Sequence, residues 1–580
     1  MENSMGEKIT MEETVTPLLK EDQDSNAKGG FTTLPFIIGN ESLEKMATYG
    51  VSPNMTLYLM KEYHMGMSSA STVLFLWSSA TNFMPLVGAV LADSFLGRFY
   101  TIGFGSTICL MGMIILWLTT IIPQAKPPLC DQSISTCITP TIFQFMFLFT
   151  SFVLISIGAG GIRSSSLAFG ANQLEKGDFK KQSGVKESYF NWYYATNTIS
   201  IVIALTCVVY IQDNMGWVIG FAVPAGLMFI GVVLFFSASA SYVRVKSESS
   251  LLTGFAQVVV AWFRNRHVKL SDGVSYIWHC KNGSGLVSPS PNLRFLNKAC
   301  VIRDPNKDLT ADGTAKDPWS LCTVDQVEEL KALVRIIPIW STGMIMSINI
   351  SQNSFPLLQA VSMDRHITSS FTIPPASFNT FTVIAVILWI TIYDRIFLPL
   401  ASRVKKKPVR ISPRRRMGIG IFLSFLAMMV SALVEAIRRA FAVHEGNMGP
   451  PLVSSHISAL WLVPQYCLNG FAEASNVIAQ NEFYFSELPR SMSSIALTLN
   501  GIGGALANLI ASFIMNMVDN ISKAGGKESW ISSDINKGHY DYYYLVLAGL
   551  SMCNMLYFLV CSRAYGPLKE DTKMREEEDE

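Results

Sequence analysis

The strongest constraint on the fold is a series of about twelve apolar stretches, each long enough for a helix of roughly 20 residues to cross a bilayer. A segment that crosses the hydrocarbon must be a helix or a strand of a closed barrel, because every backbone polar group needs a partner there. Runs such as 201–210 lack the period-two alternation of barrel strands. The sequence therefore predicts an all-α polytopic membrane protein. The expected spans are residues 32–60, 71–92, 100–122, 140–162, 189–211, 217–238, 332–353, 371–396, 416–440, 455–481, 492–517 and 541–563.

Composition excludes several other classes of protein. Half of the 580 residues are apolar, only 15% are charged, and the mean hydropathy is +0.32, whereas roughly a quarter of the residues are charged in ordinary soluble domains. The formal net charge is +2. A soluble enzyme, a disordered chain and a general nucleic-acid binder all require a more polar or more basic composition.

The spans fall into two groups of six, separated by a long polar stretch. Two parallel halves joined by a central loop are the arrangement of the major facilitator fold, in which twelve helices form two six-helix bundles around a substrate site near the midplane. Within the loop, 251–268 mixes apolar and basic residues and predicts a surface helix. The expected organisation is a tail at 1–30, a bundle at 31–238, the central loop at 239–330, a second bundle at 331–563 and an acidic tail at 564–580.

The distribution of Lys and Arg predicts the orientation in the membrane. Two loops are basic, and both should be cytoplasmic, so with twelve spans both termini are also cytoplasmic. The plasma membrane is the default location for a chain without vacuolar or transit signals. The second of the two runs could instead bind anionic lipid or a regulatory partner. The basic residues are Lys176, Lys180, Lys181 and Lys186 in the 4–5 loop, and Arg403, Lys405, Lys406, Lys407, Arg410, Arg414, Arg415 and Arg416 in the 8–9 loop.

No metal or organic cofactor is expected, because the cysteines and histidines lack ligand spacing. A membrane enzyme would need a nucleophile with a base or a metal cluster, and a channel would need a filter motif; the sequence carries neither pattern. Cys130 and Cys137 share an outward loop, where an oxidising compartment would allow a disulfide. The sequence leaves open whether these two cysteines pair.

Ionisable residues inside a span are costly and normally face a cavity or a partner, so they mark candidate sites. Glu41, Glu44 and Lys45 lie at i, i+3 and i+4 of the first span, on one face of a helix. A carboxylate stays ionised while it is paired with a cation and takes up a proton more readily once the pair breaks. These three residues are therefore the candidate proton-coupling group. The alternative is a purely structural buried ion pair.

Arg163 at the end of the fourth span is the second candidate. It follows the segment Gly158-Ala-Gly-Gly-Ile162, whose small residues allow close helix approach. Arginine stays charged and cannot relay a proton, but its planar fork suits a carboxylate or nitrate. Arg163 is thus a candidate anion-binding residue. Its position is equally compatible with a cytoplasmic boundary arginine.

The tenth span carries a polar stripe at helical period. Its members are Gln465, Asn469, Glu473, Asn476 and Gln480. Such a line on an otherwise apolar helix predicts the wall of an aqueous path, with Glu473 as substrate or proton partner and Asn469 and Asn476 beside it. Hydrogen bonding between helices is the alternative. A weaker stripe on the seventh span adds Asn349 to the candidates; it comprises Arg335, Thr342, Asn349 and Asn353.

Several motifs carry a resemblance to a known family. Gly88-x4-Asp93-x3-Gly97-Arg98 resembles the major facilitator signature, and Glu41-x-x-Glu44-Lys45 resembles the first-helix motif of the proton-coupled oligopeptide transporter family. Further stretches are similar to the plant nitrate/peptide transporter family (NPF), and the likeness extends from residue 30 to residue 565. They are Phe169-Gly-Ala-Asn-Gln173, Tyr189-Phe-Asn-Trp-Tyr-Tyr194, Phe471-x-Glu473, Ala479-Gln-x-Glu-Phe483 and Leu488-Pro-x-Ser-Met492. The Glu-Lys form of the first-helix motif and Ser166-Leu-Ala-Phe-Gly170 look most like the first NPF subfamily.

The resemblance implies proton-driven uptake by alternating access, with the first-helix cluster coupling the proton. It implies that Arg163 is the fourth-helix cation and that Glu473 is the tenth-helix carboxylate, which pairs with that cation in one state and contacts substrate in another. Peptide-carrying relatives more usually have Lys at the position of Arg163 and Arg at that of Lys45, which weakens a peptide assignment. A seventh-helix histidine, one possible nitrate contact in this family, is absent from 340–352, where the chain offers Ile350.

The major facilitator signature gives Asp93 and Arg98 a gating or structural role. Arg98-Phe-Tyr-Thr101 places a hydroxyl three residues after an arginine, at the cytoplasmic entry to the third span. A protein kinase acting there would add charge and shift the packing of the second and third helices. Most such tripeptides are never modified, so Thr101 is a candidate phosphorylation site only.

The predicted function is proton-coupled transport of a small anion, with nitrate as the first substrate. An organic acid hormone such as gibberellin is the second, and a peptide is a further alternative. A nitrate sensor with little flux would use the same pocket, and proton-dependent flux separates sensor from transporter. The expected partners are the small-molecule substrate, the proton as coupling ion and the lipid membrane.

Overall fold

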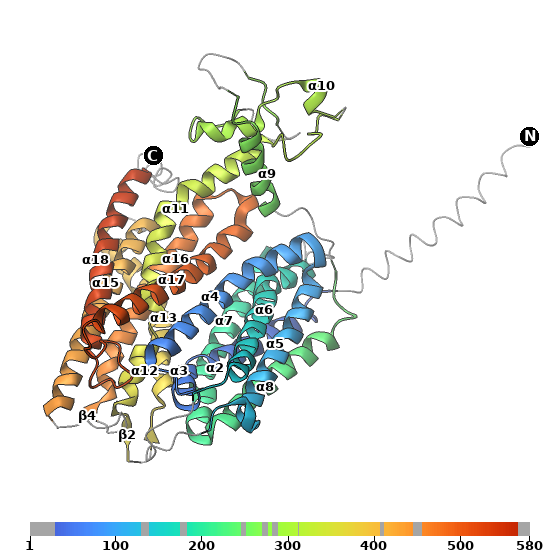
Figure 1. The fold of residues 1–580 in the computed structure, drawn as a ribbon. Helices are drawn as coiled ribbons and strands as arrows, with labels where there is room; N and C mark the ends of the chain where they lie inside the picture. Colours follow the sequence, from blue (N-terminus) through green and yellow to red (C-terminus); the bar gives the residue numbers. More distant parts are fainter. Residues whose placement is uncertain are drawn as a thin grey trace, which may run out of the picture. The chain divides into compact units, whose positions relative to one another are not determined.

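The described part of the chain is almost entirely helical (Figure 1), which confirms the all-α prediction. It forms two compact units: Met1–Met65 with Ala80–Ser247, and Gly66–Ser79 with Glu248–Glu580. The helix α4 (Met67–Leu91) is therefore divided between them. The computed structural model describes residues 29–128, 139–174, 183–244, 251–268, 276–280, 288–310, 312–369, 371–406, 411–444 and 455–566.

The first unit contains two helices where the sequence predicts one span at 32–60. The chain turns at Pro53, because proline has no amide hydrogen for a helical bond and restricts the residue before it. The expected fifth and sixth spans separate at Gly216, whose φ of 79° interrupts the helix. Besides the later part of α4, the helices are α2 Leu34–Val51, α3 Met55–Glu62, α5 Arg98–Ile121, α6 Ile142–Gln173, α7 Ser183–Ile203 and α8 Val209–Ser237, with shorter helical turns at Ala92–Leu96, Pro123–Ala125 and Ala204–Val208.

Glycines line the contact between α5 and α6. A Cβ on Gly105 would come within 2.9 Å of the Gly158 carbonyl oxygen, and one on Gly112 within 2.8 Å of the Ile155 nitrogen. A Cβ on Gly158 would collide with the backbone of Cys109. Small residues at such contacts let two membrane helices approach closely. The glycine-rich end of the fourth span therefore fixes where α6 lies against α5.

We expect Gly158→Val to lower the thermal stability of the purified protein, because added volume in a packed contact costs about 1–3 kcal/mol. Gly226→Val in α8 is the matched control, since a Cβ there meets nothing within 4 Å. Melting temperatures in detergent measure both. Equal losses in the two variants would contradict the packing role of Gly158.

The second unit contains the remaining helices and two small sheets. The strands β1 Met363–Asp364 and β4 Ser455–Ser458 pair in parallel, and β2 His366–Thr368 and β3 Phe371–Thr372 pair antiparallel. The helices are α9 Leu251–Arg264, α10 Pro305–Asp308, α11 Val324–Ile350, α12 Ser354–Val361, α13 Thr380–Ile392, α14 Leu398–Lys405, α15 Pro413–His444, α16 Val463–Glu487, α17 Ser493–Ser522 and α18 Tyr540–Tyr565, with shorter helical turns at Arg294–Cys300, Pro375–Asn379, Tyr393–Phe397, Ala459–Leu462 and Arg490–Met492.

Three expected span boundaries in this unit are wrong. The eighth and tenth spans are expected from residues 371 and 455, but strands β3 and β4 occupy those positions. These strands are too short to interrupt the apolar stretches that contain them. The seventh helix starts at Val324, earlier than expected, because Thr323 and Gln326 form a capping box that extends it into the polar loop.

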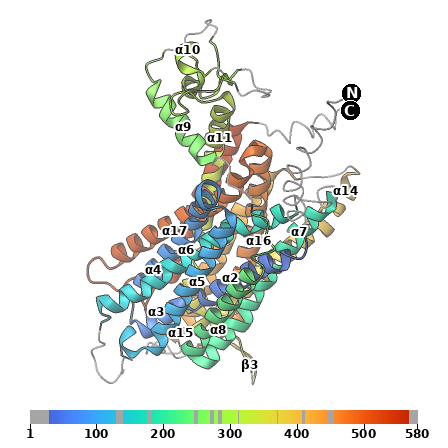
Figure 2. The ribbon, with the colours of Figure 1, turned by 90° about the vertical axis from the view of Figure 1, so that its right-hand side faces the viewer.

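The surface helix expected in the central loop is α9, which lies beside the start of α11 (Figures 1 and 2). One face of α9 is buried: Phe255, Val258 and Ala261 pack in a core with α11 and the turn Arg294–Cys300. The opposite face exposes Val259 and Phe263. The helix α9 and the turn Arg294–Cys300 are thus packed onto the seventh helix.

Nine segments of the described residues are long and apolar enough to cross a membrane. One of them, Glu187–Ser237, contains the break at Gly216 and so holds two expected spans. The helices α2 and α16 fall short because each carries polar and ionisable residues in its middle. The total of twelve spans stays a prediction.

Candidate functional site

Glu44 of α2 and Arg163 of α6 form a buried ion pair in the first unit. Arg163 Nε donates to Glu44 Oε2 at 3.1 Å, and its Nη2 donates to Oε1 at 2.8 Å. Thr48 Oγ1, one helical turn along α2, also donates to Oε1 at 2.8 Å. The Glu44 side chain is 0% exposed and that of Arg163 is 19% exposed. The structure thus joins two groups that the sequence presents as separate candidates.

Glu41, one helical turn before Glu44, contacts a different cation and a different hydroxyl group. Lys45 Nζ lies 3.4 Å from Glu41 Oε1, and the Tyr193 hydroxyl of α7 donates to Oε2. Tyr193 lies in one of the family motifs, but the sequence alone assigns no role to it. The available signal was its spacing of four from Tyr189, which places both on one face of α7. Two carboxylates therefore lie one helical turn apart on α2, each held by its own cation and its own hydroxyl group. Proton coupling by this cluster stays a prediction.

Asn197 is a further residue that sequence reasoning missed. It lies one helical turn beyond Tyr193 on α7 and is 4% exposed. Within the described part of the first unit, neither atom of its amide has a hydrogen-bond partner. A buried polar group normally has one, so an unpaired amide on the face of Tyr193 marks a place for a polar occupant.

Arg163 does not use all of its donors on Glu44. Its Nε and Nη2 are bonded, but no acceptor for Nη1 lies among the described residues of the first unit. The guanidinium is also 5.8 Å from the Tyr49 ring centroid, within the range of a cation–π contact. A buried arginine with a spare donor and partial exposure can bind a further anion.

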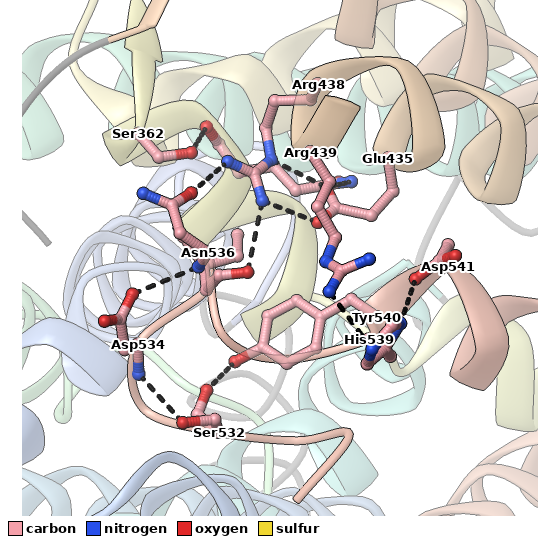
Figure 3. Close-up of polar contacts among 12 residues, drawn as sticks. Ser362, Glu435, Arg438, Arg439, Ser532, Asp534, Asn536, His539, Tyr540 and Asp541 are labelled. Carbon is pink, nitrogen blue, oxygen red and sulfur yellow. Dashed lines mark hydrogen bonds and ion pairs between the residues drawn. The ribbon is translucent and has the colours of Figure 1, made fainter. Parts of the chain in front are cut away.

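The second unit contains a comparable pair in which each of the three guanidinium nitrogens has a hydrogen-bond partner (Figure 3). In α15, Arg438 donates from Nε and Nη2 to the carboxylate of Glu435 at 2.9 and 2.7 Å. Its Nη1 donates to Asn536 Oδ1 at 2.8 Å, and Nη2 also donates to the Ile535 carbonyl at 3.2 Å. Gln359 of α12 donates to Glu435 Oε2 at 2.7 Å. This saturated pair, 0% and 1% exposed, fits a structural role.

The polar stripe of α16 divides into two groups. Gln465 donates to Gln359 of α12, Asn476 donates to the Met417 carbonyl of α15, and Gln480 packs against Gly343 of α11. Gln465 and Asn476 thus make the helix-to-helix hydrogen bonds of the structural alternative, whereas Gln480 makes a packing contact. An aqueous path along this face of α16 stays a prediction.

Asn469 and Glu473 differ from the other members of the stripe, because both are partly exposed. Among the described residues of the second unit, none forms a hydrogen bond or ion pair with Glu473. This freedom suits the role predicted for Glu473. Its implied pairing with Arg163 joins the two units and stays a prediction.

Asn349, predicted to bind substrate, ties three helices together. Its Nδ2 donates to Ser424 of α15 at 2.9 Å and to Ser551 of α18 at 2.6 Å, and it is 3% exposed. These are the bonds of a structural residue, although its Oδ1 has no partner among the described residues. A substrate role for Asn349 stays a prediction.

The 2–3 loop explains why the major facilitator signature needs its residues. Gly97 has a φ of 78°, which lets the chain leave α4 and enter α5. Arg98 Nη2 lies 3.5 Å from Asp93 Oδ1, and Arg98 Nη1 donates to the Ala168 carbonyl of α6 at 3.5 Å. The pair thus links the 2–3 loop to α6.

Thr101 lies in the first turn of α5 and is 5% exposed. Its hydroxyl donates to the Gly97 carbonyl at 3.0 Å. A kinase could reach this hydroxyl only after the end of α5 moved away from its neighbours. Modification of Thr101 stays a prediction. Cys130 and Cys137, and residues 407–410 of the basic 8–9 loop, lie outside the described residues.

Comparison with known proteins identifies the family. Residues 99–531 match the POT family, PTR2. Protein NRT1/PTR FAMILY 1.2 of Arabidopsis thaliana is 49% identical over 98% of this chain and 96% of its own length. NRT1/PTR FAMILY 1.1 of the same plant is 51% identical over 100% of this chain and 99% of its own length.

Solved structures show the fold. A crystal structure of an auto-inhibited POT family peptide transporter has a TM-score of 0.68 at 20% identity, over 93% of this chain and 98% of that one. The POT family transporter PepTSo has a TM-score of 0.66 at 19% identity, over 92% of this chain and 98% of that one. These similarities confirm the major facilitator type of fold.

Fold and site together define a helical membrane transporter and not an enzyme. The chain belongs to the POT family and, within it, to the NRT1/PTR proteins, as its motifs predict. It is therefore a proton-coupled transporter of a small molecule, held in a lipid membrane.

Proposed function

We propose that the chain moves nitrate together with protons by alternating access. The observation that carries this proposal is the Arg163 fork, which binds the planar carboxylate of Glu44 through Nε and Nη2 and leaves Nη1 without a bond to the described residues of the first unit. Nitrate is also planar and anionic, and a guanidinium binds such groups through two parallel hydrogen bonds. Glu44 and nitrate are therefore competitors for the same donors.

Protonation decides this competition. A proton on Glu44 removes the charge that holds it to Arg163, so the guanidinium becomes available to an anion. Glu41 with Lys45 and Tyr193 is the second proton site of the same group. Departure of the proton restores the Glu44–Arg163 pair and expels the anion. In this scheme, proton transport and nitrate transport are coupled because Arg163 binds either the ionised Glu44 or the anion.

Several finer roles belong to this proposal. Glu473 on α16 would contact the substrate or take up Arg163 in another state, with Asn469 beside it. The transporter would lie in the plasma membrane with cytoplasmic termini, and kinase action at Thr101 would regulate it. The name of the relatives, NRT1/PTR, supports no single substrate.

An organic acid such as gibberellin is the second candidate substrate, because its carboxylate fits the same fork. The partly buried Ile350 of α11 gives that candidate an apolar residue where a nitrate carrier could have offered histidine. A sensor with little flux would bind nitrate without transporting it.

Labelled-nitrate uptake into oocytes at an outer pH of about 5.5 and of about 7.4 tests the proposal. We expect more uptake at the acid pH. Arg163→Lys keeps the charge and loses the fork, so its KM for nitrate should rise by about tenfold or more. If the protein takes up gibberellin but not nitrate, gibberellin replaces nitrate as the proposed substrate. If the protein reaches the cell surface and takes up neither compound, the result favours the sensor. An unchanged KM in Arg163→Lys would contradict anion binding at this residue.

A further inference from the structure

The loop between α17 and α18 is fastened to α15 by two consecutive arginines (Figure 3). Arg438 holds Ile535 and Asn536, as described above. The next residue, Arg439, donates from Nη2 to His539 Nε2 at 3.0 Å. The Arg438 side chain is 1% exposed, whereas that of His539 is 30% exposed. Of these two contacts, only the one between Arg439 and His539 is accessible to protons from the solvent.

The contact with Arg439 defines the protonation state of His539. A guanidinium has donors and no acceptor, so Nε2 must accept and the imidazole must be neutral, with its proton on Nδ1. Nδ1 lies 3.7 Å from Asp541 Oδ1, and the ring stacks on Tyr542 at a centroid distance of 4.6 Å. A proton on Nε2 would turn the acceptor into a donor and place two cations side by side. The contact would then have to open.

The surrounding charges mostly oppose a charged His539. Burial and Arg439 hold the pKa of His539 below its ordinary value of 6.5, and Asp541 opposes this shift. His539 also precedes the first turn of α18, where the positive end of the helix dipole disfavours a cation. The other nearby charges are paired with one another: Glu435 with Arg438 on α15, Asp534 with Lys537 in the loop, and Asp519 with Lys523 at the end of α17.

We propose that His539 is a proton-sensitive latch that ties the loop 523–539 to α15 when neutral and releases it when protonated. The contact between His539 and Arg439 stabilises the loop above about pH 6.5, the ordinary pKa of histidine. It weakens as the pH falls through the lower pKa that His539 has in the folded protein. Arg438 keeps its own bonds to Ile535 and Asn536 at all such pH values, so the loop stays attached there while the His539 contact opens. The latch needs no substrate and is independent of the proposed nitrate transport.

Release would reach beyond the loop through Ser533. Its Oγ accepts the backbone N–H of Met67 at 3.0 Å, at the start of α4. The loop therefore connects α15 with the segment Gly66–Ser79 of the second unit. In the expected orientation this end of α18 faces the outer medium, where acid drives uptake.

Hydrogen exchange of the full-length protein in lipid nanodiscs tests the latch. After correction for the intrinsic rate, amides of 523–539 should exchange about tenfold faster at pH of about 5.5 than of about 7.5, because a charge-assisted bond is lost. His539→Gln keeps an acceptor and cannot be charged, so exchange should stay slow at both values. His539→Lys is always charged and should exchange fast at both. Asp534→Asn is the control and should keep the wild-type difference.

A pH-independent wild-type loop, or a pH difference that persists in His539→Gln, would overturn the latch. If the His539 variants do not fold, Asp541→Asn gives a second test. It removes the carboxylate that raises the pKa of His539, so the pH midpoint of loop release should move to a lower value. An unchanged midpoint would also reject the proposal.

Discussion

Glu44→Gln should abolish the acid stimulation of nitrate uptake while the protein still folds and reaches the cell surface. Glutamine has nearly the same shape and keeps an acceptor for Arg163 and Thr48, but it does not bind a proton in this pH range. The exchange of partners at Arg163 can then no longer be driven by protons. We expect the ratio of uptake at pH of about 5.5 to that at about 7.4 to fall to about one. Oocyte uptake normalised to surface biotinylation measures this ratio.

Glu62→Gln is the matched control for Glu44→Gln. Glu62 also belongs to the first unit and pairs with a cation, Lys126, at 2.6 Å, but that cation has no second predicted role. This variant should keep acid-stimulated uptake. Normal acid stimulation in Glu44→Gln would show that the proton is coupled elsewhere, and its loss in both variants would point to a general effect of removing a carboxylate.

Glu435→Gln should strongly lower the stability of the folded protein, whereas Glu44→Gln should change the pH dependence of transport. It leaves the Arg438 guanidinium buried without a counterion, and breaking a buried pair in this way costs about 3–5 kcal/mol. The melting temperature of the detergent-purified protein should fall clearly. Any loss of uptake should follow the loss of folded protein at the surface.

Asp304→Asn gives the scale for Glu435→Gln. Asp304 pairs with Lys307 at 3.6 Å, and their side chains are 40% and 84% exposed. Exposed pairs contribute about 0–1 kcal/mol, so this variant should melt near the wild-type temperature. If Glu435→Gln melts there too, the saturated pair is not structural and its role must be sought in transport.

The sequence predicts those features that depend on chain periodicity. Apolar length identifies most of the helices, and the i, i+3, i+4 spacing correctly places Glu41, Glu44 and Lys45 on one helix face. The cost of a charge in a span also marks Arg163, which the structure pairs with Glu44. These arguments require knowledge of one helix at a time.

Contacts between helices could not be predicted in the same way. Helical period gives a face but not the neighbour that covers it, so the pairing of Glu44 with Arg163 and the role of Tyr193 needed the packed structure. The Glu435–Arg438 pair is a different kind of omission. Both residues lie in the expected span 416–440, so the rule that identified Arg163 applied to them equally.

The division of α4 between the two units has a mechanical consequence. Its early part is docked on α17, where Asn516 donates to Thr72 at 3.0 Å and Ser79 donates to the Ala505 carbonyl at 2.9 Å. Its later part, from Ala80, belongs to the other unit. Any movement between the two bodies must either undock the first turns of α4 or flex the helix. Pro85 removes one backbone hydrogen bond close to the division, so α4 bends more easily there. Bending at this position is therefore opposed by the stiffness of a single helix.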